Sequence, residues 1–423
     1  MISRRDVLRG AAGTAGLIAT ERCALFSHPP VPPPGPAGID HVVVVTMENR
    51  SFDHLLGWLP DAEARQAGLT YRDGSGAARP THALAPDFQG CGHPDPDHSY
   101  AGGRVEYNDG ACDGWLQAGA NDEYAIGYYV RDDLAFLGRA AADWTVCDHY
   151  FASIMAETFP NRFYQHAAQT DRIDNSLSIS RLPTIWDRLA SAGRTGRYYF
   201  SDVPFLALWG PKYISIGRTF STFEADCASG RLADVSFVDP SFLNESSGTA
   251  NADHPHADIR NGQVFLNRVY EAVTRSPAWP RTLLVMCYDE WGGFFDHVAP
   301  PIRVTSEADR AAGNVDGRLG FRVPCVIVSP HARRKHIAIA ELDHTSVLRF
   351  IETRWQLTAL TERDRTATSL SDVLAPDTST LDTPRYEVPS GPFGGPCAAA
   401  AARAVEDDWS RVLELARTHG WKA

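Results

Sequence analysis

The sequence has little that would suit a nucleic-acid-binding or membrane-spanning protein. Acidic residues outnumber basic ones, 52 to 40, and the formal net charge is -12. Nucleic-acid binding depends on a basic surface that displaces phosphate counterions, so this balance argues against such a partner. After the N-terminal region, no apolar run reaches the roughly 20 residues that a membrane-spanning helix needs. We therefore expect no nucleic-acid partner and no transmembrane anchor in the mature chain.

The eight cysteines also lack the spacing of a metal site, because no CxxC pair or zinc-finger pattern occurs among them. Cys91 and Cys112 both lie in a region rich in Gly, Pro and Asp. They are the pair best placed to form a disulfide in an oxidising compartment. Cys287 and Cys325 lie in apolar, strand-like runs, which predicts buried thiols.

The N-terminus has the layout of an export signal. Arg4 and Arg5 precede a mild apolar stretch of small residues at 11–19, which resembles a twin-arginine (Tat) signal peptide; a basic helix start is the alternative. Proline-rich residues then form an extended spacer. We assign 1–28 to the signal peptide and 29–38 to the linker. The Tat export machinery is then an expected partner, and the expected location is periplasmic, cell-wall or extracellular.

The rest of the 423 residues alternates between β-rich and helical patterns. The strand candidates are 41–46, 197–200, 234–238, 282–286 and 323–328. The helix candidates are 184–192, 264–274 and 343–355, the last with Asp343 as its N-cap. This alternation predicts an α/β fold with a mostly parallel central sheet and helices on both faces. We expect a catalytic domain at 39–375, with a loop-rich excursion at 60–125, and a C-terminal extension with one helix at 376–423.

The strongest functional signal is the run from Tyr288 to His297, YDEWGGFFDH. Asp289 and Glu290 follow an apolar run of strand length, so they should emerge where a strand ends. Adjacent carboxylates repel each other and are costly to desolvate. Beside two glycines and an Asp-His pair, they indicate a bound cation or a reacting group, although a solvated acidic turn is the alternative.

Other strand candidates end in polar residues in the same way. Glu48 and Asn49 follow the first, Asp239 the middle one, and His331 the last. If the strands are parallel, their carboxyl ends meet at one edge of the sheet. Residues far apart in the sequence can then share one site.

The candidate nucleophile is Thr158, although a helix cap is the alternative reading. A threonine hydroxyl is a weak nucleophile unless a metal ion lowers its pKa. Asn161 and Arg162, just past a proline, could contact phosphoryl oxygens. The oxygen ligands available for a divalent cation such as Ca, Mg or Mn, with Zn as a further option, are Glu48, Asn49, Thr158, Asp289 and Glu290.

Two histidines with neighbouring carboxylates could transfer protons to the leaving group. These are His98 and His254. A surface histidine without a role is the alternative for each. His297 also follows an aspartate and is the next candidate for a place near the substrate. It is preferred to His344, which follows an aspartate too but is placed at a helix start.

Four motifs together resemble the defining motifs of the bacterial phosphoesterase family, which contains non-toxin-type phospholipases C and acid phosphatases. They are residues 48–54, 158–162, 253–255 and 288–297. The resemblance implies an alkaline-phosphatase-like three-layer fold, a metal site on the five ligands named above, and a phosphothreonine intermediate at Thr158. It also implies that His98 and His254 lie near the substrate.

The prediction is therefore a secreted, metal-dependent phosphoesterase of the phospholipase C type, with a phosphate ester, including a phospholipid, as substrate. An acid phosphatase of the same family is the alternative, since the chain has no room for the extra β domains of longer phospholipases. A sulfatase would need Cys or Ser at Thr158, and a non-catalytic binding protein is more remote. Aromatic residues could line a lipid pocket or belong to the core, and Trp291 could tune substrate choice. They are Phe52, Tyr100, Trp115, Tyr128, Tyr129, Trp291 and Phe294.

Overall fold

The computed structural model describes residues 38–375, 380–397 and 403–422. The predicted signal peptide, 1–28, and all but the last residue of the predicted linker, 29–38, lie outside the described residues. None of the helices in the described ranges is long and apolar enough to cross a membrane.

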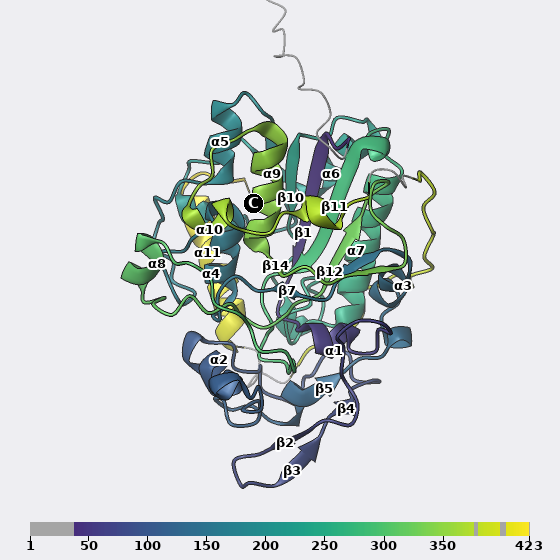
Figure 1. Cartoon of the computed structure of the whole chain (residues 1–423), viewed down its shortest axis with the longest axis vertical. Helices are drawn as coiled ribbons and strands as arrows, with labels where there is room; N and C mark the ends of the chain where they lie inside the picture. The colour runs from purple at the N-terminus through teal and green to yellow at the C-terminus, as the bar shows by residue number, and fades with distance from the viewer. Residues whose placement is uncertain (1–37, 376–379, 398–402, 423) are drawn as a thin grey trace, which may run out of the picture. The chain divides into compact units, whose positions relative to one another are not determined.

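An eight-stranded sheet forms the centre of the fold, in the order β13-β6-β12-β11-β1-β10-β8-β9. Its strands β12, β11, β1 and β10 are labelled in Figure 1. Neighbouring strands run parallel, except that β12 is antiparallel to both β11 and β6. The predicted mostly parallel sheet is thus confirmed. The strands are β1 (His41–Met47), β6 (Thr145–Cys147), β8 (Gly196–Phe200), β9 (Gly217–Thr219), β10 (Val235–Val238), β11 (Thr282–Tyr288), β12 (Cys325–Val328) and β13 (His336–Ala338).

Helices lie on both sides of this sheet, as predicted for an α/β fold. In Figure 1 the strands run between one group of helices that includes α4, α5 and α9 and a second group that includes α3, α6 and α7. A sheet covered on both faces needs strands that are apolar throughout, and all seven residues of β11 are buried. These helices are α3 (Leu137–Asp143), α4 (Thr158–Ala167), α5 (Ile185–Ser191), α6 (Phe220–Ala228), α7 (Ile259–Thr274) and α9 (His344–Trp355).

The predicted helix starts follow local chemistry. Asp343 is the N-cap of α9, and its carboxylate accepts a hydrogen bond from the backbone N–H of Thr345 at 2.6 Å. Thr184 caps α5 in a capping box with Asp187. The helix predicted at 264–274 starts earlier, at Ile259, because Asp258 supplies its cap.

The excursion predicted at 60–125 contains only short elements. The other strands and helices not yet named, inside and outside this excursion, are also short, apart from one helix in the C-terminal extension. The short strands are β2 (Thr70–Arg72), β3 (Ala78–Pro80), β4 (His82–Ala83), β5 (Gly127–Tyr128), β7 (Tyr150–Phe151) and β14 (Leu342–Asp343). The remaining helices are α1 (Phe52–Leu56), α2 (Tyr100–Tyr107), α8 (Glu307–Ala312), α10 (Glu362–Arg365) and α11 (Arg403–Thr418).

The strand register decides which chain segments meet at the edge of the sheet. β1 pairs with β11 from His41 opposite Thr282 to Met47 opposite Tyr288, and with β10 on its other side. The residues that follow these strands therefore leave the sheet at the same edge.

His331 is an exception to the predicted meeting of strand ends. It follows β12, which runs antiparallel to β11, so it leaves at the opposite edge. There its Nε2 lies 3.1 Å from the carbonyl oxygen of Pro280, which precedes β11.

The predicted disulfide between Cys91 and Cys112 is wrong. Cys91 is bonded to Cys397, with a Cα–Cα distance of 5.2 Å. Cys112 is a buried free thiol that packs in an apolar cluster with Trp115. The C-terminal extension supplies the partner of Cys91. Cys287 and Cys325 are buried thiols, as predicted.

Candidate active site

The two acidic motifs meet where β1 and β11 end. The backbone N–H of Asp289 donates to the carbonyl oxygen of Met47 at 3.0 Å, which continues the parallel pairing past the strands. The backbone N–H of Asn49 donates to Oδ1 of Asp289 at 3.2 Å. Gly292 allows this close approach, because a Cβ at its position would lie 2.1 Å from the carbonyl oxygen of Asn49. The structure thus brings Glu48-Asn49 and Asp289-Glu290 together.

Thr158 joins this centre from the first position of α4. Its hydroxyl donates to Oδ1 of Asn49 at 3.3 Å, and the side chain is buried. The amide of Asn161, one turn later, bonds the backbone before Thr158: Nδ2 donates to the carbonyl oxygen of Ala156 at 2.8 Å, and Oδ1 accepts from the N–H of Ile154 at 3.1 Å. Asn161 therefore fixes the turn that presents Thr158, rather than offering a free amide to a substrate.

Arg162 lies among the acids of the centre. Its Nε donates to Oδ2 of Asp289 at 3.1 Å, and NH1 donates to Oδ1 of Asp239 at 2.9 Å. NH2 lies 3.5 Å from Oε1 of Glu48. One guanidinium thus faces three buried carboxylates. Sequence reasoning placed Asp239 at this edge but gave it no part in the site, since no local pattern links it to Arg162.

The acids of the centre retain unused oxygens. Both carboxylate oxygens of Glu48 and Oε1 of Glu290 are buried without a hydrogen-bond partner. Burial raises the pKa of Glu290 to about 8, although His98 opposes the rise. Burial, together with the charge of Asp289, also raises the pKa of Glu48 against the opposing effect of Arg162. Buried carboxylate oxygens without partners are costly, and a hard divalent cation would satisfy them, so these residues fit the metal that the sequence predicts.

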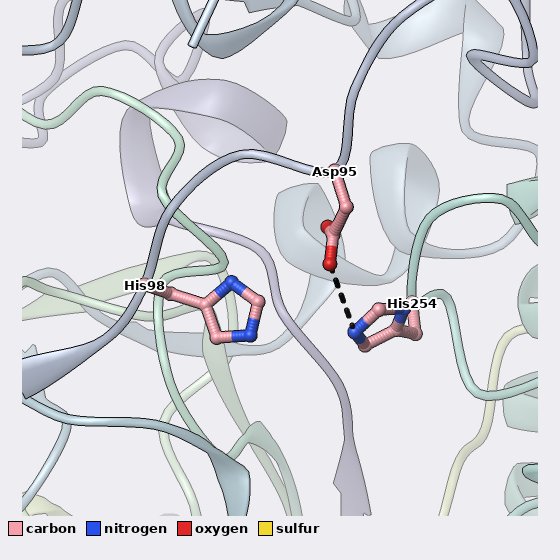
Figure 2. A group of neighbouring side chains, drawn as sticks. All are labelled: Asp95, His98 and His254. Atoms are coloured by element: carbon pink, nitrogen blue, oxygen red, sulfur yellow. Dashed lines mark ion pairs between the residues drawn. The ribbon is translucent and has the colours of Figure 1, made fainter. Parts of the chain in front are cut away.

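The two predicted catalytic histidines lie together with Asp95 (Figure 2). The ring centroids of His98 and His254 are 5.9 Å apart, and Nε2 of His98 lies 3.2 Å from Nδ2 of Asn49. Nε2 of His254 lies 3.8 Å from Oδ2 of Asp95. The histidine pair therefore borders the Thr158 centre through Asn49.

The surrounding residues shift the pKa values of these two histidines in opposite directions. Burial would lower the pKa of His98, but the carboxylates of Glu290 and Asp95 raise it to about 10. Burial lowers the pKa of His254 well below its usual value, and the charge of His98 lowers it further. Near neutral pH, one ring is charged and its neighbour is neutral.

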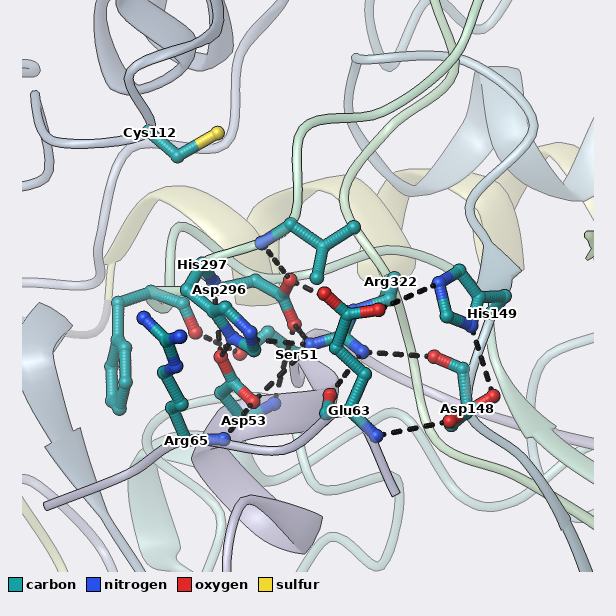
Figure 3. A network of polar contacts seen from close by, with 12 residues as sticks. Ser51, Asp53, Glu63, Arg65, Cys112, Asp148, His149, Asp296, His297 and Arg322 are labelled. Atoms are coloured by element: carbon teal, nitrogen blue, oxygen red, sulfur yellow. Dashed lines mark hydrogen bonds and ion pairs between the residues drawn. The ribbon is translucent and has the colours of Figure 1, made fainter. Parts of the chain in front are cut away.

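His297 lies in a different group of residues (Figure 3). Its Nδ1 contacts Oδ2 of Asp53, and the guanidinium of Arg322 bonds Asp53 at 3.2 Å and Asp296 at 2.9 Å. The structure does not bring His297 to Thr158. His344, which sequence reasoning set aside, lies at the centre instead, with Nε2 2.7 Å from the carbonyl oxygen of Asp289.

Most of the aromatic residues that could have lined a lipid pocket belong to the core. Trp291 is fully buried, and its Nε1 donates to Oε2 of Glu106 at 2.8 Å. Its ring packs against Phe321, with centroids 5.5 Å apart. The other fully buried members of this set are Phe52, Trp115, Tyr129 and Phe294.

The chain is similar to known proteins over most of its length. Residues 39–358 match the family model described as the phosphoesterase family. The chain is 30% identical over 391 residues to non-specific phospholipase C6 of Arabidopsis thaliana, covering 83% of this chain and 74% of the relative. It is 30% identical over 390 residues to phospholipase C A of Mycobacterium tuberculosis, covering 75% and 73%. A solved structure in the alkaline phosphatase superfamily, from Vibrio parahaemolyticus, aligns with a TM-score of 0.37 and 8% identity over 77% of this chain and 68% of the other.

Proposed function

Because this chain belongs to the phosphoesterase family, we propose that it is a secreted, metal-dependent enzyme that hydrolyses phosphate esters in the manner of a phospholipase C. The observation that carries the proposal is a buried threonine hydroxyl at a helix start, 3.3 Å from Asn49 and beside acids with unpartnered oxygens. The phospholipase C names of the relatives in Arabidopsis thaliana and Mycobacterium tuberculosis support a phospholipid as the substrate class.

The metal would be held by the oxygen donors of the centre, as Ca, Mg, Mn or Zn. When bound, it would lower the pKa of the threonine hydroxyl and offset the negative charge of the phosphoryl group. Arg162 neutralises part of the same acidic set. The proposed ligands are Glu48, Asn49, Thr158, Asp289 and Glu290.

In the proposed reaction, Thr158 loses its hydroxyl proton to solvent before the attack, its oxygen forms a bond to phosphorus, and the bond from phosphorus to the leaving alkoxide breaks. His98 carries a proton at neutral pH and can pass it to that alkoxide. Water then attacks the phosphothreonine, the P–O bond to Thr158 breaks and returns the threonine alkoxide, and the neutral His254 is suited to accept the proton of that water. Exchange of protons with solvent restores both histidines for the next turnover. Two adjacent rings with different protonation supply an acid and a base.

An acid phosphatase acting on phosphomonoesters is the second candidate. Its support is the burial of the aromatic residues, such as Trp291 and Phe294, that could otherwise have formed a lipid pocket. A non-catalytic secreted binding protein is more remote. The Cys91–Cys397 disulfide supports an oxidising destination, for which we propose export by the Tat machinery.

The test is a side-by-side assay of phosphatidylcholine, a choline phosphodiester and a phosphomonoester with the mature protein. We expect hydrolysis of phosphatidylcholine; preferential hydrolysis of the monoester would support the phosphatase instead. Thr158→Ala should reduce turnover by at least about 10³-fold, because the nucleophile is lost. Thr158→Ser is the matched control and should retain measurable turnover. Undiminished turnover by Thr158→Ala would overturn the mechanism.

A further inference from the structure

The C-terminal extension returns to the active-site side of the molecule as a short segment, residues 391–397, which we call the strap. It ends at Cys397, whose disulfide partner Cys91 lies 306 residues earlier. Cys91 is seven residues before His98, in the same loop. A covalent bond therefore ties the strap to the segment that carries one of the two proposed catalytic histidines.

The strap binds this loop through hydrogen bonds as well. Nε2 of Gln89 donates to the carbonyl oxygen of Gly395 at 2.6 Å, and the N–H of Gly395 donates back to Oε1 of Gln89 at 3.1 Å. The guanidinium of Arg260 lies 4.6 Å from the ring centres of both Phe88 and Phe393. One side of the strap is thus joined to residues 88–91.

The strap also binds the loop that leads to His254. The N–H of Cys397 donates to the carbonyl oxygen of Ser246 at 2.8 Å. Asn261 bonds Phe393 twice, at 2.8 and 3.1 Å, and also donates to the carbonyl oxygen of Gly248 at 2.8 Å. The strap therefore bridges the two segments that carry the histidines.

We infer that the disulfide-anchored strap positions His98 and His254 relative to each other, so that full activity requires the Cys91–Cys397 bond. The two loops also meet directly, where Nε2 of His256 lies 3.0 Å from the carbonyl oxygen of His93. This contact is weaker than a covalent bond. Breaking the disulfide should leave the fold in place but loosen the spacing of the two rings.

The inference rests on the proposed function and adds a condition to it. Reduction by a dithiol adds two electrons and two protons to the disulfide, giving two thiols, while the dithiol becomes a cyclic disulfide. Oxidised glutathione reverses the change. A chain folded in a reducing cytoplasm would thus be poorly active and would gain activity once oxidised after export.

The experiment compares oxidised protein, protein reduced with dithiothreitol, and the double variant Cys91→Ser with Cys397→Ser, with thiol counting by mass spectrometry. We expect kcat to fall about 10- to 100-fold with little change in KM, because misplaced groups slow the chemical step. Reoxidation with oxidised glutathione should restore the kcat of the reduced wild-type protein. Dithiothreitol should not affect the double variant further, which controls for the five free cysteines that are buried in the described part of the chain.

A second variant tests the strap with the disulfide intact. Gly394 has φ +84°, and a Cβ there would lie 2.9 Å from the carbonyl oxygen of Gly248, so Gly394→Ala should disturb the strap and lower kcat in the same direction. Unchanged kcat in fully reduced, folded protein, even with a lower melting temperature, would overturn the inference. No hydrolysis by the oxidised protein would instead contradict the proposed function.

Discussion

The two acidic motifs, residues 48–54 and 288–297, each contribute side chains to two separate regions of the structure. The leading residues, Glu48 with Asn49 and Asp289 with Glu290, form the Thr158 centre. The trailing acids, Asp53 and Asp296, meet each other around Arg322 in the group that Figure 3 shows, which we call the arginine network. Both regions are buried and acidic, and both contact a histidine.

The difference lies in how the carboxylates are satisfied. In the arginine network, Asp53 accepts from Arg322 and from the backbone N–H groups of Arg65 and His297, the latter two at 3.0 Å. In the Thr158 centre, Glu48 has no hydrogen-bond partner for either oxygen. Buried acids with hydrogen-bond partners stabilise a fold, whereas buried acids without partners need a proton or a bound cation. The two regions should therefore respond to mutation in opposite ways.

The largest expected effect is on activity. Glu48→Gln should lower kcat by about 10³-fold, because it removes a proposed metal ligand whose loss would cost several kcal/mol in the transition state. Without metal, its melting temperature should stay the same or rise, since one carboxylate fewer repels Asp289. The assay is turnover at saturating substrate with thermal unfolding in parallel. Glu352→Gln, also buried but outside the site, is the matched control and should remain active. Full activity of Glu48→Gln would contradict the assignment.

A mutation in the arginine network should instead lower the stability of the fold. Arg322→Met leaves Asp53 and Asp296 buried without their cation, so we expect unfolding free energy to fall by about 3–5 kcal/mol. Urea denaturation measures this change. Arg275→Met, which removes an exposed pair with Glu271, should cost less than about 1 kcal/mol. A change in Arg322→Met as small as that of the control would mean that the network does not hold the fold.

The comparison also shows how far sequence could predict the molecule. The strand ends and their meeting were predictable, because Glu48 and Asp289 each follow an apolar run and parallel strands share an edge. The division of each motif between the Thr158 centre and the arginine network was not predictable. His297 follows an aspartate just as a site histidine would, but in the structure its ring contacts Asp53 beside Arg322. His344 reaches Asp289 because α9 packs there, and no periodicity in the sequence records that contact. The partner of Cys91 was missed for the same reason, since Cys397 lies 306 residues away.

Metal binding at the Thr158 centre should stabilise the protein. At free metal one hundred times the dissociation constant, binding to the folded state adds about 2.7 kcal/mol to the unfolding free energy. Chelation should remove both this gain and the activity, and the divalent ion should restore both. Thermal unfolding with and without metal measures the gain, which Glu48→Gln should lose and Glu352→Gln should keep. Full activity after exhaustive chelation, checked by elemental analysis, would exclude the metal.

The smallest expected effect is on the pH dependence of stability and concerns Glu352, a buried acid outside the Thr158 centre. Glu352 also has an oxygen without a partner, but its other oxygen shares the N–H of Leu360, at 3.3 Å, with Asp364. Burial and the neighbouring Asp364 raise the pKa of Glu352 to about 9, from a usual value of 4.5. A carboxyl with a raised pKa holds its proton more tightly when folded. Its contribution to stability is complete below pH 4.5 and is lost as the pH rises towards 9.

Glu352→Gln cannot lose a proton and should flatten this decline. The difference in urea midpoint between variant and wild type should therefore grow in favour of the variant from pH 6 to pH 9, with no response to metal. A difference that does not change with pH would mean that Glu352 is ionised in the folded protein. An ionised buried carboxylate would then lack a partner without any metal, and the unpartnered oxygens of Glu48 and Glu290 would no longer support the proposed metal at the Thr158 centre.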